Sequence, residues 1–328
     1  MILLLGASGL LGHNVLRLLL ERGERVRVLL RPGSDLCPFG QSPQLPTPEI
    51  LRGSLLDPDI LLQAAEGCGA IINCAGTTDM ALRRLEDYLP VNRDLPAQLC
   101  RVMEETGIRT LVHTSTANTI AAGSREHPTD ESAPFAAPFD KSLYAISKLA
   151  GERVLLDYAA GHPERHVIIV NPGFMIGPCD PKPSSGKLLL TGYRKALMAA
   201  PCGGKSFLHV RDAATAICNA LERGESGRYL LTGESLTLRE FYALQAQVCG
   251  YRQRFVTLPA PLVRLAGRIG DLLQRLGVRT MLCTRNTDQL LIEEAYDCTR
   301  AERELGLPHT PVSDAIRDFF AWRSTECE

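Results

Sequence analysis

Six short apolar segments recur along the first 173 residues, at 1–6, 25–30, 49–54, 70–76, 110–116 and 166–173. Most of them alternate with segments that have helical periodicity, at 10–23, 57–67, 92–106 and 144–159. Alternating strands and helices predict an α/β fold, namely a doubly wound, Rossmann-like parallel sheet with helices on both faces. Ligands of such sheets bind beyond the carboxyl ends of the strands.

After residue 173 the pattern changes to a Pro/Gly/Ser-rich loop at 177–186, followed by segments with helical periodicity at 187–200, 238–249, 259–276 and 312–322. Two segments, at 206–224 and 227–233, look like a return to the sheet layer. We therefore expect a dinucleotide-binding domain over 1–173, completed by about 207–232. Residues 174–206 and 233–328 are expected to form an interleaved, smaller and mostly helical substrate lobe.

The composition excludes several classes of protein. With 45 % hydrophobic and 22 % charged residues and a net charge of −1, the chain has no basic field that would attract nucleic acid. Outside the first 20 residues there is no run of about 18 apolar residues, and glycines interrupt that first stretch, so we expect neither a signal peptide nor a membrane partner. These features predict a cytoplasmic protein.

The cysteines and histidines do not form a recognisable metal or disulfide framework. The 11 cysteines are scattered and include no C-x-x-C pair, which is typical of reduced thiols. Only His162 and His166 have helical ligand spacing, and Pro163 lies between them. We therefore predict no metal site.

A glycine-rich loop follows the first predicted strand. "GASGLLG" places glycines at 6, 9 and 12 and leads into a helix. In that context, backbone N–H groups and the helix N-terminus can approach a pyrophosphate, since each glycine lacks a Cβ that would block it. The alternative is an ordinary strand–helix turn, but the position within a βαβ unit favours nucleotide binding.

The second strand ends in Arg31. A cofactor with a free ribose 2′-hydroxyl usually meets an acidic residue about 20 residues beyond the glycines, whereas a guanidinium can bind a 2′-phosphate. Arg31 therefore predicts NADP as the preferred cofactor, with NAD possible through Asp35. The alternative is a solvated arginine at a strand end.

Three further residues indicate proton transfer. Tyr144 and Lys148 in "YAISK" share one helix face, about 6 Å apart along the axis. A nearby ammonium favours a phenolate and lowers the tyrosine pKa. Thr116, at the end of the fifth strand, could hydrogen-bond a substrate oxygen beside the phenol. The alternative is a chance Y-x-x-x-K in an amphipathic helix, but its position after the fifth strand favours function.

Together these motifs resemble the extended short-chain dehydrogenase/reductases, a group that includes nucleotide-sugar epimerases, dihydroflavonol reductases and 3β-hydroxysteroid dehydrogenases. The resemblance rests on "GASGLLG", "NCAG" at 73–76, "HTST" at 113–116, "YAISK" and "NPGFMIGP" at 171–178. Later landmarks at 207–217 and 296–306 extend it almost end to end. The chain looks most like bacterial dihydroflavonol-reductase-like and 3β-hydroxysteroid-dehydrogenase-like proteins.

The resemblance implies roles for individual residues. Tyr144 would be the general acid/base, Lys148 would bind the nicotinamide ribose and lower the tyrosine pKa, and Thr116 and Asn92 would complete the catalytic set. The cofactor-binding positions are Gly6, Ser8, Gly9, Leu10, Leu11, Gly12, Arg31, Ser54, Leu55, Cys74, Ala75, Gly76, Tyr144, Lys148, Pro172, Gly173 and Met175.

Three departures from the family pattern narrow the expected reaction. Gly53-Ser54-Leu55 replaces a stretch that often carries an adenine-binding aspartate, so recognition there is weaker or uses the backbone of Leu55. Ala117-Asn118 stands where dehydratases have an acidic pair, which argues against loss of water. "TIAAG" at 119–123 replaces a "VYG" common in epimerases.

The leading hypothesis is an NADP-dependent oxidoreductase that reduces a ketone, or oxidises a secondary alcohol, of a small and fairly apolar molecule. One alternative is a nucleotide-sugar epimerase with tightly bound NAD. Another is a non-catalytic protein that senses cofactor on the same fold, although a sensor does not need a Thr-Tyr-Lys set. The resemblance also implies a homodimer formed by the helices at 92–106 and 144–159.

Overall fold

The central element is a parallel sheet. The computed structural model describes residues 1–36, 45–181 and 183–326. Its 7-stranded sheet has, in spatial order, β10 (Gly227–Leu231), β6 (His166–Pro172), β5 (Thr110–Thr114), β4 (Ala70–Asn73), β1 (Ile2–Leu5), β2 (Val26–Leu30) and β3 (Glu49–Arg52). Every neighbouring pair is parallel. The predicted doubly wound α/β fold is confirmed.

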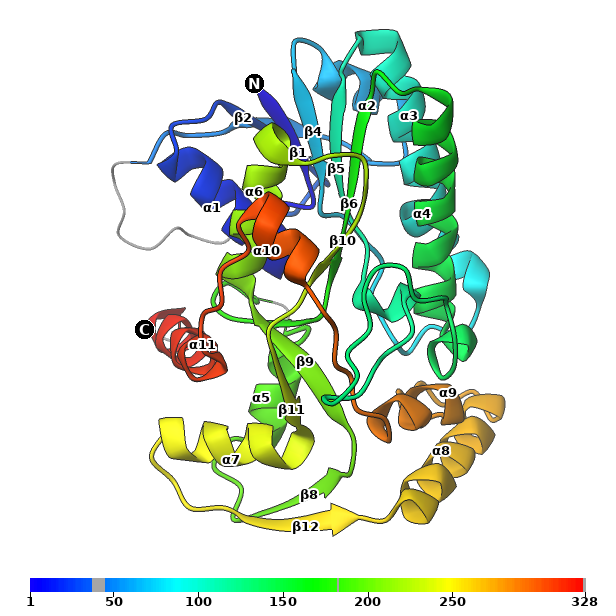
Figure 1. The fold of residues 1–328 in the computed structure, drawn as a ribbon, viewed down its shortest axis with the longest axis vertical. Helices are drawn as coiled ribbons and strands as arrows, with labels where there is room; N and C mark the ends of the chain where they lie inside the picture. Colours follow the sequence, from blue (N-terminus) through cyan, green and yellow to red (C-terminus); the bar gives the residue numbers. More distant parts are fainter. Residues whose placement is uncertain (37–44, 182, 327–328) are drawn as a thin grey trace.

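Helices cover both faces of this sheet, as Figure 1 shows. One face packs against α1 (Leu10–Glu21), α6 (Val210–Arg223) and α10 (Thr299–Leu305). The other packs against α2 (Pro58–Ala65), α3 (Leu95–Thr106) and α4 (Leu143–Gly161). Because both faces of the inner strands are buried, these strands are largely apolar, which explains runs such as "ILLL" in β1.

Local signals start and stop these helices. The Asp57 side chain accepts a hydrogen bond from the Asp59 N–H at 3.1 Å, and Pro58 occupies the first helical position of α2. Gly107, with φ of +75°, ends α3 in the left-handed conformation. The start of the predicted helix at 92–106 differs, because Pro90–Asp94 forms one π-helical segment, η2, and α3 begins at Leu95.

The C-terminal half adds helices and two small sheets. One sheet has the order β11 (Glu234–Thr237), β9 (Gly204–His209), β7 (Phe174–Ile176), and the other pairs β12 (Arg254–Leu258) with β8 (Leu197–Pro201). The helices are α5 (Gly186–Gly192), α7 (Leu238–Val248), α8 (Ala260–Arg275), α9 (Thr284–Thr287) and α11 (Val312–Glu326). Residues from α5, α7, α11 and the strands share a separate apolar core. The predicted helices at 238–249, 259–276 and 312–322 are confirmed.

The prediction of one helix over 187–200 is wrong beyond Gly192. Arg194 has a φ of +55°, which is incompatible with continuing the helix, and residues 197–201 extend to pair with β12 in parallel. This pairing joins segments more than 50 residues apart. The apolar spacing within 187–200 suits a helix, so the local pattern carried no sign of the partner strand. The lobe therefore contains two small sheets, while helices remain its larger part.

The predicted return to the sheet layer is confirmed for two elements. Strand β10 forms the edge of the central sheet beside β6, and α6 packs on α1. Strand β9 instead joins β7 and β11. The division into domains at residue 173 stays a prediction. Residues 37–44 of the predicted loop at 32–48, and residue 182 of the loop at 177–186, lie outside the described residues.

Two composition-based predictions can be compared with the structure. Within the described ranges, none of the helices combines the length and apolar character needed to cross a membrane. The nine cysteines described by the structure are all free thiols, as expected from their scattered positions.

Candidate active site

The glycine loop joins β1 to α1 and fits against the end of β4. Gly6 has a φ of +82°, and a Cβ on it would lie 2.6 Å from the backbone N of Ala75. A Cβ on Gly12 would lie 2.2 Å from the carbonyl oxygen of Gly6. Both positions therefore require glycine for close approach of the backbone.

The N-terminus of α1 is open to an anion. Gly9 is its N-cap, so there is no side-chain cap, and no acidic residue lies in the first turn. The backbone N–H groups of the first turn lack intrahelical acceptors. Ser8 and Gly9 lie at the surface of this turn, and Leu10 and Leu11 anchor the helix in the core. The arrangement fits the pyrophosphate of a dinucleotide.

The ends of β2 and β3 lie side by side at the edge of the sheet. Arg31 follows β2 and is exposed. The Asp35 carboxylate, which could have served a ribose hydroxyl, pairs with the Arg52 guanidinium at 3.0 Å. Ser54 follows β3, and its hydroxyl accepts a hydrogen bond from the Leu56 N–H at 3.1 Å, so Leu55 is held in a tight turn.

The segment after β4 meets the helix that carries Tyr144 and Lys148. Cys74 accepts a hydrogen bond from the Thr114 hydroxyl at 3.7 Å, and Ala75 N–H donates to the Asn73 side chain at 3.0 Å. Gly76 is exposed, and a Cβ on it would come within 2.9 Å of the Lys148 Nζ. Gly76 thus lets the lysine reach the edge of the sheet.

The end of β6 closes the other side. Pro172 is buried as the last residue of β6, and Gly173 donates its N–H to the Leu231 carbonyl at 2.9 Å. A Cβ on Gly173 would lie 2.7 Å from the carbonyl oxygen of Ser206, so this turn also requires glycine. Met175 is half-buried in β7.

Helix α4 presents Tyr144 and Lys148 one turn apart. Ser142 caps the helix by accepting a hydrogen bond from the Ala145 N–H at 3.4 Å, which places Tyr144 in the first turn. Thr116 follows β5, and its side chain lies near enough to the Tyr144 phenol to lower the phenol pKa. The Lys148 Nζ donates to the Thr114 carbonyl at 2.9 Å. The structure therefore brings the three predicted side chains to the same carboxyl edge.

Burial raises the pKa of Tyr144 to about 12, while Thr116 lowers it and Glu152 raises it further. This direction is opposite to the lowered pKa expected from the sequence, because burial outweighs the other effects and the Lys148 ammonium is directed to the Thr114 carbonyl. The phenol is consequently neutral at neutral pH and able to donate a proton.

Burial lowers the pKa of Lys148 to about 8, although its electrostatic interactions with Glu152 and Cys74 raise it. The side chain is almost fully buried, with 3 % exposed, so its ammonium loses most of its hydration. At neutral pH it still carries a proton. It is therefore a buried cation beside the sheet edge, at the position predicted to contact a ribose.

Asn92 lies in the π-helical segment η2 and is fully buried. Its side chain accepts from the Thr77 N–H at 2.9 Å and donates to the Thr77 carbonyl at 3.0 Å and to the Ser147 hydroxyl at 2.9 Å. A Cβ on Gly151 would come 2.1 Å from the Asn92 carbonyl oxygen. Asn92 thus connects the loop after β4 to helix α4.

Comparisons with known proteins identify the family. The model of the NAD dependent epimerase/dehydratase family matches residues 2–232. The chain belongs to this family. It is 29 % identical to the sterol demethylase protein B of Methylococcus capsulatus, over 98 % of this chain and 97 % of that protein. It is 28 % identical to a Synechocystis sp. protein that has a provisional name as a dihydroflavonol 4-reductase, over 97 % and 92 % of the two chains.

A solved structure supports the same assignment. The crystal structure of gox2253 superposes with a TM-score of 0.83 at 28 % identity and covers 99 % of this chain and 98 % of that one. Other relatives are named as dehydrogenases, reductases and epimerases. The chain is thus an NAD(P)-dependent enzyme of the extended short-chain dehydrogenase/reductase type, as its motifs indicated. The individual roles of the site residues stay predictions. The preference for NADP over NAD also stays a prediction.

One buried residue of this extended short-chain enzyme was missed by the sequence analysis. Glu152 is fully buried two turns after Tyr144. Its Oε1 accepts hydrogen bonds from the Ser115 hydroxyl, from Thr119 Oγ1 at 2.7 Å and from Asn171 Nδ2 at 2.7 Å. The Arg228 guanidinium lies 3.8 Å from its other oxygen. Burial raises the pKa of this carboxyl, while these partners lower it.

Glu152 ties together the elements that carry the site. Its partners lie after β5, in the short helix η3 (Ala117–Thr119), in β6 and in β10. Glu152 lies four residues after Lys148 and therefore on the same helix face. This spacing could have identified Glu152 in the sequence. Its partners, however, come from distant segments that no local pattern connects.

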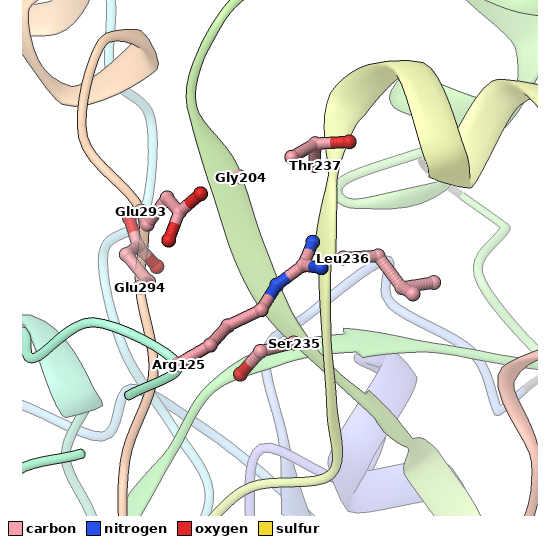
Figure 2. Close-up of a pocket in the computed structure, with 7 residues that line it drawn as sticks. All are labelled: Arg125, Gly204, Ser235, Leu236, Thr237, Glu293 and Glu294. Atoms are coloured by element: carbon pink, nitrogen blue, oxygen red, sulfur yellow. The ribbon is translucent and has the colours of Figure 1, made fainter. Parts of the chain in front are cut away.

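A small pocket lies away from the Tyr144 site, between the loop after Thr116 and the β9–β11 sheet. Figure 2 shows Arg125 extending towards Leu236 and Thr237, with Glu293 and Glu294 on the neighbouring segment. The Arg125 guanidinium forms an ion pair with Glu240, so it is already engaged within the protein. We assign no ligand to this pocket.

The prediction of no metal site stays a prediction. In the described part of the chain, the side chains of Cys298, Glu302 and His309 lie close enough together to hold an ion. They already form hydrogen bonds among themselves, since Glu302 Oε1 lies 2.8 Å from His309 Nε2 and 3.3 Å from Cys298 Sγ. This cluster is on the opposite side of the sheet from Tyr144, beside α10.

Proposed function

We propose that the protein is an NADP-dependent oxidoreductase that reduces a ketone, or oxidises the corresponding secondary alcohol, of a small and fairly apolar molecule. The observation that carries this proposal is the grouping of Thr116, Tyr144 and Lys148 at one sheet edge, beside the glycine loop. The Thr116 side chain lies near the Tyr144 phenol, and Lys148, one turn further along the helix, donates to the Thr114 carbonyl.

In the proposed reduction, the glycine loop and Lys148 would hold a nicotinamide cofactor, which would provide hydride chemistry at the carbonyl carbon. Tyr144 donates the phenol proton to the carbonyl oxygen as that oxygen gains negative charge. Thr116 donates a hydrogen bond to the same oxygen and holds it beside the phenol. Because the pKa of Tyr144 is raised to about 12, the phenol keeps this proton until negative charge develops on the carbonyl oxygen.

Lys148 would hold the cofactor and offset the charge that develops on Tyr144. Its ammonium lies beside Gly76, at the strand edge where a ribose would approach. Because it is buried, its charge acts through a medium of low dielectric and has more effect than on the surface. Asn92 would maintain this arrangement by bonding both Thr77 and Ser147.

Two features support NADP over NAD. Arg31 is exposed at the end of β2, where the adenosine ribose of a Rossmann-like fold is expected. Asp35 is paired with Arg52 rather than directed back to the end of β2. An exposed pair is worth little energy, so this second feature only removes a preorganised acceptor for a 2′-hydroxyl.

The apolar character of the substrate is supported by relatives whose names refer to sterol and dihydroflavonol chemistry. The test is oxidation of NADPH, followed by absorbance, with a panel of sterol-type ketones, flavonols, simple ketones and nucleotide sugars. We expect turnover with apolar ketones. Turnover of nucleotide sugars with NAD that copurifies tightly with the protein would favour the epimerase alternative instead.

Cofactor choice is tested by calorimetric titration with NADPH and NADH. We expect NADPH to bind about ten- to a hundredfold more tightly, since charge-assisted hydrogen bonds contribute about 1.5–3 kcal/mol. Arg31→Asp should reduce or invert this ratio. Arg25→Asp, which changes an exposed arginine just before β2 and at its other end, is the matched control and should leave the ratio unchanged. Equal affinities in the unmodified protein would contradict the role of Arg31.

A homodimer formed by α3 and α4 is part of the same proposal. It is taken from the resemblance to enzymes that pair two helices from each subunit. Light scattering should give about twice the chain mass of 35.8 kDa. A single-chain mass at micromolar concentration would count against it.

A further inference from the structure

Helix α8 exposes a continuous apolar surface. Five side chains at alternating spacings of three and four residues are more than half exposed: Leu262 54 %, Leu265 51 %, Ile269 51 %, Leu272 57 % and Leu276 72 %. This spacing places them on one helix face, and we call them the α8 stripe. Beyond the helix the apolar surface continues through Val278, Met281 and Leu282, each about half exposed. Exposed apolar surface of this extent marks an interaction site.

The opposite face of α8 is fixed against the protein. A Cβ on Gly267 would lie 2.3 Å from the Thr287 hydroxyl, and one on Gly270 would lie 1.7 Å from the Leu282 carbonyl oxygen. Asp271 accepts a hydrogen bond from the Thr284 N–H at 3.1 Å. These contacts leave no room for the helix to rotate, so the α8 stripe faces outward because of how the helix is packed.

The exposed charged residues of α8 are all arginines. Arg264, Arg268 and Arg275 are exposed, and at about 100° per residue they lie along one long edge of the α8 stripe. The single acidic residue in the helix is Asp271, which is bound to Thr284 on the packed side. The surface is therefore apolar with a cationic margin.

Helix α8 connects to the loop after β4 through α9, against which it packs. Arg285 donates to the Leu82 carbonyl at 2.7 Å, and Asn286 donates to the Met80 carbonyl at 3.1 Å. These carbonyls belong to the loop that leaves the sheet at Gly76 and is held by Asn92 through Thr77. Figure 1 shows α8 and α9 together at an outer edge of the molecule, beyond the central sheet.

We propose that α8 and the turn after it bind the surface of an anionic lipid bilayer, with the α8 stripe inserted at the boundary between headgroups and acyl chains. Amphipathic helices with an apolar face and basic flanks bind in this way without spanning the membrane. The sequence-based prediction of no membrane partner rested on the absence of a spanning segment, which a peripheral helix does not require. This inference does not depend on the proposed function.

Charge complementarity selects this occupant over a second copy of the chain. Two α8 stripes packed face to face would bring the arginine margins of both helices to the same interface, where like charges repel. An anionic surface instead attracts all three arginines. The apolar residues and the arginines then act together.

The test is flotation of the purified full chain with vesicles of phosphatidylcholine alone and of phosphatidylcholine with phosphatidylglycerol. We expect binding to the anionic vesicles, weaker at high salt, and at least about tenfold weaker binding to the neutral ones. The double variant Ile269→Ser with Leu272→Ser should lose at least about tenfold in binding, and so should Arg264→Glu with Arg268→Glu. Leu197→Ser, which changes an apolar side chain that is 59 % exposed on β8, is the matched control and should bind as the unmodified protein does.

Each outcome decides the proposal. Absence of binding to anionic vesicles, or equal binding by the α8 variants and the unmodified protein, would overturn it. Light scattering that shows a dimer dissociated by the Ile269→Ser and Leu272→Ser changes, with no vesicle binding, would assign the α8 stripe to a second copy instead. Retained cofactor binding shows that each variant is folded.

Discussion

Helices α4 and α8 both depart from the usual distribution of side chains, in opposite directions. Helix α4 buries three polar side chains, Ser147, Lys148 and Glu152, whereas α8 and its C-cap residue expose the five large apolar side chains of the α8 stripe. Charged side chains are seldom buried unless they are paired, and contiguous apolar surface is seldom exposed without a partner. We therefore infer that each helix has a role in addition to stabilising the fold.

The two helices differ in where these unusual side chains find their partners. The buried polar groups of α4 have partners inside the protein. Ser147 accepts from Asn92, Lys148 donates to the Thr114 carbonyl, and Glu152 accepts from three donors through Oε1, with Arg228 at 3.8 Å from its other oxygen. Such a network fixes the position of every member and suits a site that must be preorganised. The apolar side chains of α8 are exposed to solvent, so only a partner outside the chain can bury them.

The largest expected effect comes from removing one atom from α4. In Tyr144→Phe the ring keeps its packing and the proton donor is lost, so we expect turnover to fall by about two to four orders of magnitude. Cofactor affinity should change little. Steady-state kinetics and calorimetry on the same preparation measure both, with Leu272→Ser on α8 as the control that retains activity. Normal turnover by the phenylalanine variant would refute the proposed proton transfer.

The next effect concerns stability. Glu152→Ala leaves Ser115, Thr119 and Asn171 without their shared buried acceptor, so we expect the free energy of unfolding to fall by about 3 kcal/mol. Glu152→Gln keeps an oxygen acceptor, so its free energy of unfolding should fall distinctly less than that of Glu152→Ala. Urea denaturation of the three proteins measures this. If the alanine variant were as stable as the unmodified protein, the buried network would not hold the site together.

The sequence was sufficient where a signal is local. The glycine spacing after β1, the turn spacing of Tyr144 and Lys148, and the capping residues Asp57 and Gly107 each depend on neighbours within a few residues. The fold class followed from the order of such signals. For the same reason the sequence placed Thr116 at the end of β5, next to the helix that follows.

The features that the sequence did not reveal depend on contacts between distant segments. Residues 197–201 form a strand because β12 offers a partner, and the same apolar spacing would otherwise suit a helix. The direction of the Tyr144 pKa shift depends on burial by surrounding segments. An amphipathic helix such as α8 normally packs its apolar face inward, and only the three-dimensional structure shows that glycines occupy the packed face instead.

A smaller effect follows from the buried lysine of α4. With a pKa lowered to about 8, Lys148 loses its ammonium above that pH, so cofactor affinity should fall by at most about tenfold per pH unit there. In the unfolded chain lysine keeps its proton up to about pH 10.4, so the unfolded state binds more protons between these values and stability should rise with pH. Calorimetric titrations and urea midpoints measure the two opposite trends. Lys148→Met should abolish both, and a profile for this variant equal to that of the unmodified protein would contradict the assignment.

The smallest effect is expected on α8. Leu272→Ser removes a side chain that is 57 % exposed, so the free energy of unfolding should change by no more than about 0.5 kcal/mol. Leu155→Ala, on the fully buried face of α4, should cost about 2–5 kcal/mol, because it removes core contacts and leaves a cavity. Urea midpoints of the two variants give the comparison directly. A loss in Leu272→Ser as large as that in Leu155→Ala would mean that the α8 stripe is already covered in solution, by a second copy of the chain, and the two helices would then differ only in which molecule buries them.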